Sequence, residues 1–219
     1  QVFFVWGLCI TIWNLGTYAL FLTPAQALGE AYTWAKLMQF GVIFIPVTML
    51  HLCLLLVGAK PTRWLNVAYA FHGVLAVMNA FDLFISGTHY VGYAHYSIAG
   101  IGFWIYTLAF GQSFLSIILL WKKRREMPLR QRNRYNGILA AQALLVFLGT
   151  NDILPIIGID HYPLTSTPVV PYGSLAAVAY GVMVAYSVFQ YQLLDVHLAL
   201  GRSAAYLVRF GFLLVIAII

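Results

Sequence analysis

The sequence predicts an all-α fold, a polytopic bundle of transmembrane helices, and three observations support this. Of the 219 residues, 62% are hydrophobic and only 8% are charged, which lies far outside the range of soluble domains. Long apolar runs recur along the chain, and the connections between them alternate between basic ones and ones without Lys or Arg. The net charge of +6 therefore reflects membrane topology, and we expect the lipid bilayer rather than nucleic acid as the partner of the basic residues.

Six apolar runs are long enough to cross the bilayer core, which takes about 20 residues as a helix. Strands of a closed barrel would alternate apolar and polar residues, whereas these runs are apolar on all faces, so we expect helices. We expect one transmembrane domain over residues 1–202, followed by the truncated start of a further apolar helix at 203–219. The six runs cover residues 2–22, 32–58, 64–86, 97–121, 135–158 and 171–194.

The orientation of these helices follows from the basic stretch 121–135, which holds seven of the twelve Lys and Arg residues. Basic residues beside apolar spans stay on the cytoplasmic side of a membrane. The connections after the second and sixth runs are also basic, whereas loops 23–30, 86–96 and 159–171 contain neither Lys nor Arg. We therefore expect a multi-pass protein with its basic connections in the cytoplasm. The predicted topology anchors are Lys122, Lys123, Arg124, Arg125, Arg130, Arg132 and Arg134.

Two prolines and two cysteines lie within the apolar runs. Pro46 interrupts the second run and Pro155 lies near the end of the fifth. Because proline removes a backbone hydrogen bond, we expect each to kink its helix. Cys9 and Cys53 show no metal-binding or redox spacing, so they are predicted to be small buried hydrophobic residues.

The second run, Thr33–Gly58, reads TWAKLMQFGVIFIPVTMLHLCLLLVG. It resembles the second or third helix of the seven-helix sensor region at the N-terminus of bacterial membrane histidine kinases and related signalling proteins. Ile10–Leu20 resembles the preceding helix, and Gly149–Ile159 resembles the outer end of the penultimate one. Ala185–Arg202 resembles the exit segment, although two glutamines stand where that family commonly has arginines. The residues that carry the resemblance in the second run are Trp34, Ala35, Gly41, Pro46 and His51.

This resemblance implies a membrane-embedded sensory domain of a bacterial two-component signalling protein, located in the inner or plasma membrane. Such a domain detects a small-molecule or membrane stimulus and relays it by helix rearrangement to a cytoplasmic signalling module in the same or a partner chain. The resemblance also implies a homodimer, a further helix before Gln1, and no catalysis within these residues. Two other classes stay open from the residues alone: a structural or haem-bearing subunit of a larger membrane complex, and a small transporter.

Polar residues near the outer ends of three runs form a candidate ligand pocket. An ionisable group inside a bilayer costs about 2.5–3.5 kcal/mol on insertion scales, so such groups often serve function. If the runs pack together, these residues would line an acidic pocket that suits a cation, an amine or another hydrogen-bonding molecule. The alternative is that they join helices by hydrogen bonds worth ~1 kcal/mol each. The candidates are Asn14, Asn79, Asp82, Asn151 and Asp152, covered by His89, Tyr90, His95, His161 and Tyr162.

The sequence shows no recognisable catalytic or metal-binding motif, so we predict no catalytic residue, no metal and no cofactor. One weaker alternative concerns His51 and His72, which lie at similar depth in adjacent runs. Two facing histidines at one depth can hold a b-type haem. The competing interpretation is that each is an interior histidine with partners in the protein.

Overall fold

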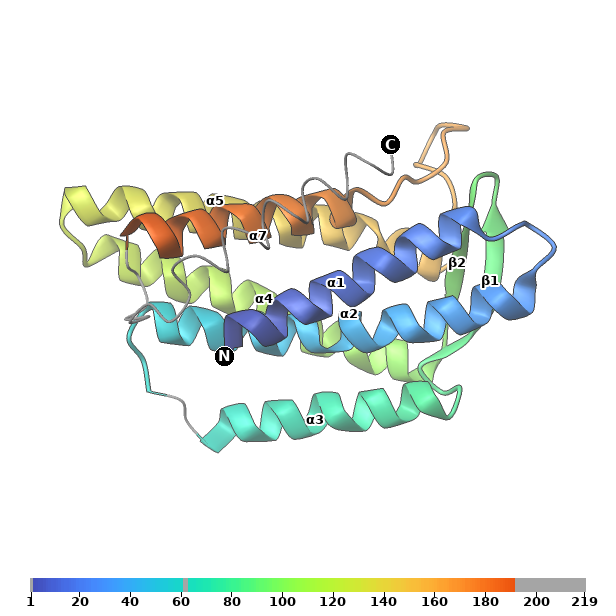
Figure 1. Ribbon diagram of the computed structural model, residues 1–219, viewed down its shortest axis with the longest axis horizontal. Coiled ribbons are helices and arrows are strands. Elements are labelled where there is room, and N and C mark those ends of the chain that lie inside the picture. Colours follow the sequence, from blue (N-terminus) through green and yellow to red (C-terminus); the bar gives the residue numbers. More distant parts are fainter. Residues whose placement is uncertain (1, 61–62, 192–219) are drawn as a thin grey trace.

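The computed structural model describes residues 2–60 and 63–191, so the predicted domain boundary at residue 202 and the predicted exit segment beyond 191 lie outside the described residues. The long helices lie side by side as a bundle, with a β-hairpin across one end (Figure 1). The prediction of a helical membrane fold is confirmed. The helices are α1 (Val2–Leu22), α2 (Leu28–Leu56), α3 (Arg63–Ala80), α4 (Ile101–Arg125), α5 (Leu129–Asn151), α6 (Ile153–Ile156) and α7 (Tyr172–Tyr191), and the strands are β1 (Ile85–Val91) and β2 (Ala94–Ala99).

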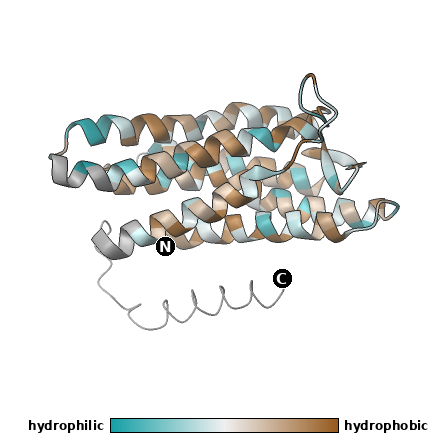
Figure 2. Ribbon diagram, turned by 90° about the horizontal axis from the view of Figure 1, so that it is seen from above, coloured by the Kyte–Doolittle hydropathy of each residue, from teal (hydrophilic) through white to brown (hydrophobic). Residues whose placement is uncertain are grey.

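Within the described part of the chain, four helices are long and apolar enough to cross a membrane. These are α1, α2, α4 and the segment Tyr135–Ile156, and the apolar part of α7, Tyr172–Tyr186, is shorter. Helix α3 has 18 residues, about 27 Å at 1.5 Å per residue, which approaches the thickness of a bilayer core. Hydrophobic residues predominate along the middle of the helices (Figure 2).

The predicted runs 64–86 and 97–121 are wrong at their facing ends, because the hairpin takes residues from both. Helix α3 ends at Ala80, and Asp82 adopts a left-handed φ of 61° that a helix cannot continue through. The strands pair antiparallel from Val91 and Ala94 outward, and Gly92 supplies the positive φ of 60° that the two-residue turn requires. The Gly, His and Tyr residues of 86–96 interrupt the apolar runs, so the sequence predicted a loop there, and hydropathy alone assigned the strand ends, Ile85 and 97–99, to the neighbouring helices.

Helices α1 and α2 pack closely because two glycines face the partner backbone. A Cβ on Gly16 would lie 2.4 Å from the Cβ of Met38, and one on Gly41 would lie 2.4 Å from the carbonyl oxygen of Cys9. Both distances are below van der Waals contact, so neither position accepts a larger residue without moving the helices apart. Small residues serve the same purpose at many membrane helix interfaces.

Pro46 lies inside α2, which continues through it. Because proline has no N–H, the carbonyl of Val42 loses its helical partner. The hydroxyl of Tyr106 on α4 donates to this carbonyl at 3.1 Å. The next carbonyl, that of Ile43, accepts from Nδ1 of His72 on α3 at 2.5 Å. Two neighbouring helices thus hold α2 at the position where its own hydrogen bonding is interrupted.

The two ends of the bundle differ in charge, as the alternating connections predicted. One end holds the hairpin and the loops 23–27 and 157–171 (Figure 1). At the other end, α4 extends to Arg125 and α5 begins at Leu129, so the basic stretch forms two helix ends joined by a short turn. There the guanidinium groups of Arg124 and Arg125 lie 4.8 and 5.3 Å from the ring of Trp121, and Lys123 pairs with Glu126 at 3.1 Å.

Candidate functional site

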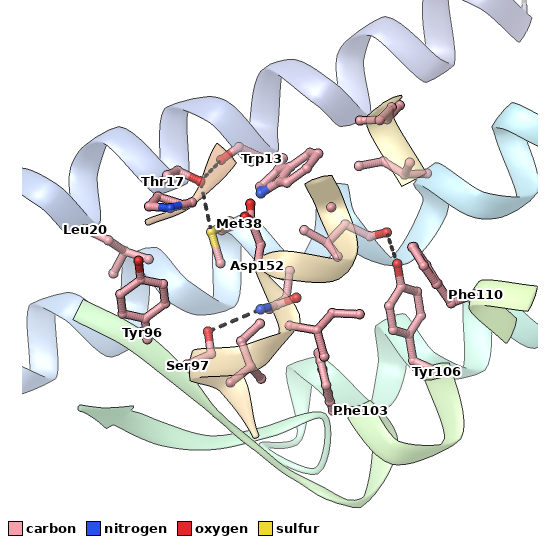
Figure 3. A pocket seen from close by; sticks show the side chains of 18 of the residues that line it. Trp13, Thr17, Leu20, Met38, Tyr96, Ser97, Phe103, Tyr106, Phe110 and Asp152 are labelled. Atoms are coloured by element: carbon pink, nitrogen blue, oxygen red, sulfur yellow. Dashed lines mark hydrogen bonds between the residues drawn. The ribbon is translucent and has the colours of Figure 1, made fainter. Parts of the chain in front are cut away.

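A cavity of about 90 Å³ lies beneath the hairpin, between α1, α2, α4, α5, α6 and β2 (Figure 3). Most of its wall is apolar or aromatic, which is the usual composition of a small-molecule site. The long helices contribute this wall, and the hairpin contributes the residues from Ala94 to Ser97. Its principal apolar residues are Trp13, Met38, Phe103, Tyr106, Phe110 and Ile153.

Polar groups at the hairpin side of the cavity come from α2 and β2. The amide Nε2 of Gln39 donates to Oγ of Ser97 at 3.2 Å, and both side chains are buried (Figure 3). His95, also buried, contacts the carbonyl of Pro24 through Nε2 at 3.0 Å. Because a carbonyl only accepts, Nε2 of His95 carries the proton. The far wall adds Ser113 of α4, which is fully buried.

Asp152 lines the cavity where α5 gives way to α6. Its Oδ1 accepts from the backbone N–H of Gly173 at 3.1 Å and from Nδ2 of Asn151 at 3.4 Å. A Cβ on Gly173 would lie 2.5 Å from Oδ2 of Asp152, so glycine is needed for α7 to approach this carboxylate. In Figure 3 the Asp152 side chain reaches toward Trp13 and Met38.

The hairpin is tied to the loops around it and covers the cavity. Nε2 of His89 donates to Oδ1 of Asp160 at 2.9 Å, which links β1 to the loop before α7. The hydroxyls of Tyr93 and Tyr96 both donate to the carbonyl of Val169, the latter at 3.1 Å. Burial raises the pKa of both tyrosines above the ordinary value, so both hydroxyls stay protonated and continue to donate.

A second polar cluster joins α2 to the turn after α3, away from the cavity. Nζ of Lys36 lies 2.5 Å from Oδ1 of Asp82, and the hydroxyl of Tyr32 donates to the same oxygen at 2.8 Å. Asn79 donates through Nδ2 to the carbonyl of Lys36 at 2.9 Å. The hydrogen bonds from Lys36 and then Tyr32 lower the pKa of Asp82, which is exposed. These contacts serve to hold the helices together.

The candidate pocket residues therefore do not share one cavity: His95 and Asp152 line it, and the others lie around it. Asn14 donates to the carbonyl of Ile10 in its own helix at 2.9 Å. Asn151 donates to the carbonyl of Val170 at 2.6 Å and accepts from Tyr162 at 2.9 Å. The exposed side chains of Tyr90 and His161 lie outside the cavity lining. The helices satisfy most of these groups locally, which the sequence could not show. Their ligand role stays a prediction.

Sequence reasoning missed Gln39, Ser97 and Ser113. Gln39 did carry a signal, because a polar amide in the middle of an apolar run is costly unless it has a partner or a function. The two serines carried none, since serine is common at helix interfaces in membranes. The aromatic wall of the cavity was hidden for a similar reason, because aromatic residues also face lipid.

The two histidines considered for haem have partners in the protein. His51 contacts the hydroxyl of Tyr69 through Nδ1 at 3.0 Å, and His72 holds the carbonyl of Ile43. Neither lines the cavity. These contacts give both histidines a structural role. Among the described residues, no group of three or more His, Cys, Asp or Glu side chains could hold a metal ion.

The bundle is apolar, one of its ends is basic, and a hairpin covers a cavity at the other end. These features define the class of protein as a multi-pass membrane domain with a pocket near one end. Residues 1–197 match the family described as the N-terminal 7TM region of histidine kinase, and the chain belongs to this family. The resemblance inferred from the sequence is thus confirmed. Comparison with curated proteins and with solved structures returned no significant match.

Family membership links this chain to a histidine kinase signalling module. The match covers the 7TM region, and no kinase domain is detected within the 219 residues. Membership also makes the chain a multi-pass membrane protein.

Proposed function

We propose that this chain is the sensory domain of a bacterial histidine kinase and that the cavity beneath the hairpin binds a small-molecule stimulus. The observation that carries the proposal is a set of buried polar atoms at the cavity. Oε1 of Gln39, Nδ1 of His95 and Oγ of Ser113 have no hydrogen-bond partner among the described residues. Nine other buried side-chain atoms among the described residues also lack a partner, so it is the gathering of three around one cavity, rather than their being unpaired, that supports an occupant.

The stimulus reaches this cavity from outside the cell if the basic end of the bundle faces the cytoplasm. The charge pattern supports this orientation, because the loops at the hairpin end contain no Lys or Arg. Because the chain belongs to a histidine kinase family, we infer that the membrane is the bacterial inner or plasma membrane. In this orientation the linked kinase module lies at the basic end of the bundle, opposite the cavity.

The relay begins at Pro46. Tyr106 lines the cavity and also holds the carbonyl of Val42, which the proline leaves without a helical partner. A ligand that binds more tightly to one position of Tyr106 than to another shifts the population of two α2 arrangements. Since α2 extends from the hairpin end to the basic end, such a shift is carried across the membrane.

Filling the cavity tests this proposal without knowledge of the ligand. Val146 is buried in the cavity wall, so Val146→Phe occupies space that a ligand would need. Val178 on α7 is 53% exposed on the outside of the bundle, so Val178→Phe is the matched control. The full-length kinase is reconstituted in lipid vesicles and its autophosphorylation is measured.

We expect Val146→Phe to move autophosphorylation away from the wild-type level by at least about threefold, because it mimics or blocks occupancy, while Val178→Phe stays at that level. Wild-type phosphorylation in a folded, correctly inserted Val146→Phe protein would show that the cavity is not coupled to the kinase.

A further inference from the structure

We propose that the ligand of this cavity is a short-chain primary amine, bound as its ammonium ion with the head at Asp152 and the tail among the aromatic residues. This inference rests on the proposed function, because it names the ligand class of the same cavity. Three properties of the cavity support it: its size, its apolar wall and the kind of polar atom that it leaves free.

The size favours small ligands. At about 90 Å³, the cavity is smaller than an engineered apolar cavity of ~150 Å³ that binds benzene. Sugars, nucleotides and peptides are too large for it. The wall formed by Trp13, Phe103, Tyr106 and Phe110 leaves little polar surface, so most of the ligand must be apolar. A chain of a few carbon atoms with one polar head meets both conditions.

Two of the three free polar atoms accept hydrogen bonds, and the third, the hydroxyl of Ser113, can accept or donate. Gln39 uses its Nε2 to donate to Ser97, so the unpaired atom is the carbonyl oxygen Oε1. His95 uses Nε2–H to donate to the carbonyl of Pro24, so its unpaired Nδ1 has a lone pair when the ring is neutral. A carboxylate or phosphate head would meet lone pairs here. A head with several N–H or O–H donors would be complementary.

The carboxylate of Asp152 favours a cationic head group over a neutral one. Its recorded partners, the N–H of Gly173 and the amide of Asn151, are neutral and both contact Oδ1. Among the described residues, no Lys, Arg or His lies within ion-pair distance of this carboxylate. A part-buried carboxylate is stabilised by a charged partner or by a proton, and an ammonium ion supplies three N–H donors together with the opposite charge.

Three probes of equal chain length test the charge of the head. n-Butylamine, n-butanol and butyrate are titrated against the full-length kinase in lipid nanodiscs, and saturable binding is measured by ligand-observed NMR with empty nanodiscs as the blank. We expect n-butylamine to bind at least about tenfold more tightly than n-butanol, because a charge-assisted hydrogen bond is worth more than a neutral one. Butyrate should show no saturable binding.

Two variants and one control locate the site. Asp152→Asn keeps the shape of the side chain and removes its charge, so it should weaken n-butylamine binding by about tenfold or more and leave n-butanol unchanged. Gln39→Leu removes one acceptor and should weaken the amine about threefold or more. Glu30→Gln is the matched control, because Glu30 is an exposed carboxylate in the first turn of α2, at the same end of the bundle and outside this cavity. It should bind the amine as the wild type does. If Asp152→Asn fails to fold, the amine affinity of Gln39→Leu tests whether the amine binds in this cavity.

Equal binding of n-butanol and n-butylamine, or full amine affinity in both folded variants, would overturn the amine assignment. The amine-binding test and the test of the sensing role can fail independently of each other. If no probe binds saturably while Val146→Phe still changes autophosphorylation, the amine inference fails and the sensory cavity stands. If the amine binds as described while Val146→Phe is silent, the binding site stands and its coupling to the kinase fails.

Discussion

Replacing Tyr106 with phenylalanine should destabilise the bundle because its hydroxyl holds a backbone carbonyl that Pro46 leaves without a helical partner. The substitution removes one oxygen from a buried ring and creates almost no cavity, so the lost hydrogen bond dominates the change. An unsatisfied buried acceptor costs about 1–3 kcal/mol, whereas measured hydrogen bonds between membrane helices average about 0.6 kcal/mol. Between these two values we expect a cost of about 1 kcal/mol.

The dependence on Pro46 makes this prediction specific. In a Pro46→Ala background the backbone N–H restored at position 46 can bond to the carbonyl of Val42, so the same Tyr106→Phe change should cost only a few tenths of a kcal/mol. The coupling energy in this double-mutant cycle should therefore be about 0.5–1 kcal/mol. Equilibrium unfolding in detergent micelles, followed by tryptophan fluorescence or circular dichroism, gives the four free energies of unfolding.

Tyr135→Phe is the matched control for this cycle. Its hydroxyl donates to the carbonyl of Leu56 at 2.7 Å, ten residues beyond Pro46 in the same helix. The cost of Tyr135→Phe should be the same in the wild-type and Pro46→Ala backgrounds, because residue 46 does not change the partner of Leu56. If Tyr106→Phe costs the same in both backgrounds as well, the proline does not create the need for the Tyr106 hydroxyl.

Two further predictions concern the helix contacts. Gly41→Ala should lower the free energy of unfolding by about 1–3 kcal/mol, because its Cβ would lie 2.4 Å from a backbone oxygen of α1. Gly7→Ala, where nothing lies within 4 Å, should leave it unchanged or raise it by up to about 1 kcal/mol, because alanine favours the helix more than glycine does. Equal losses in the same unfolding assay would contradict the close packing. Hydrogen bonds from Lys36 and Tyr32 lower the pKa of Asp82 below its ordinary value of 3.8, so these bonds to the ionised carboxylate stabilise the folded state. Their contribution to stability is fully present above pH 3.8 and is lost as the pH falls through the lower pKa of the folded state. Asp82→Asn, which tolerates the left-handed backbone there, should remove this part of the acid sensitivity, measured as the slope of unfolding free energy against pH below about 4. An unchanged slope would show that the interaction does not contribute.

The sequence alone determined that the chain is a helical membrane domain, and it identified the two kinds of connection that meet at opposite ends. The physical reason is that a bilayer accepts only helices or closed barrels, so composition and length are sufficient evidence. The charge pattern needed no contact between helices, because each connection carries its own charge. The family resemblance was also readable, because the residues that carry it, Trp34, Gly41, Pro46 and His51, lie within one apolar run and need no tertiary contact to be seen.

The tertiary structure alone decided which polar residues meet. Asp82 and Asp152 are both carboxylates near the ends of apolar runs, yet one pairs with Lys36 in an exposed turn and the other lines the cavity. The hairpin was equally hidden, because residues 86–96 have the composition of a loop and the strand ends, Ile85 and 97–99, were assigned to the neighbouring apolar runs. In a chain this apolar, hydropathy identifies what enters the membrane but does not distinguish one helix neighbour from another. Which helices pack against each other depends on glycine contacts, on a proline that frees a carbonyl and on hydrogen bonds between residues far apart in sequence.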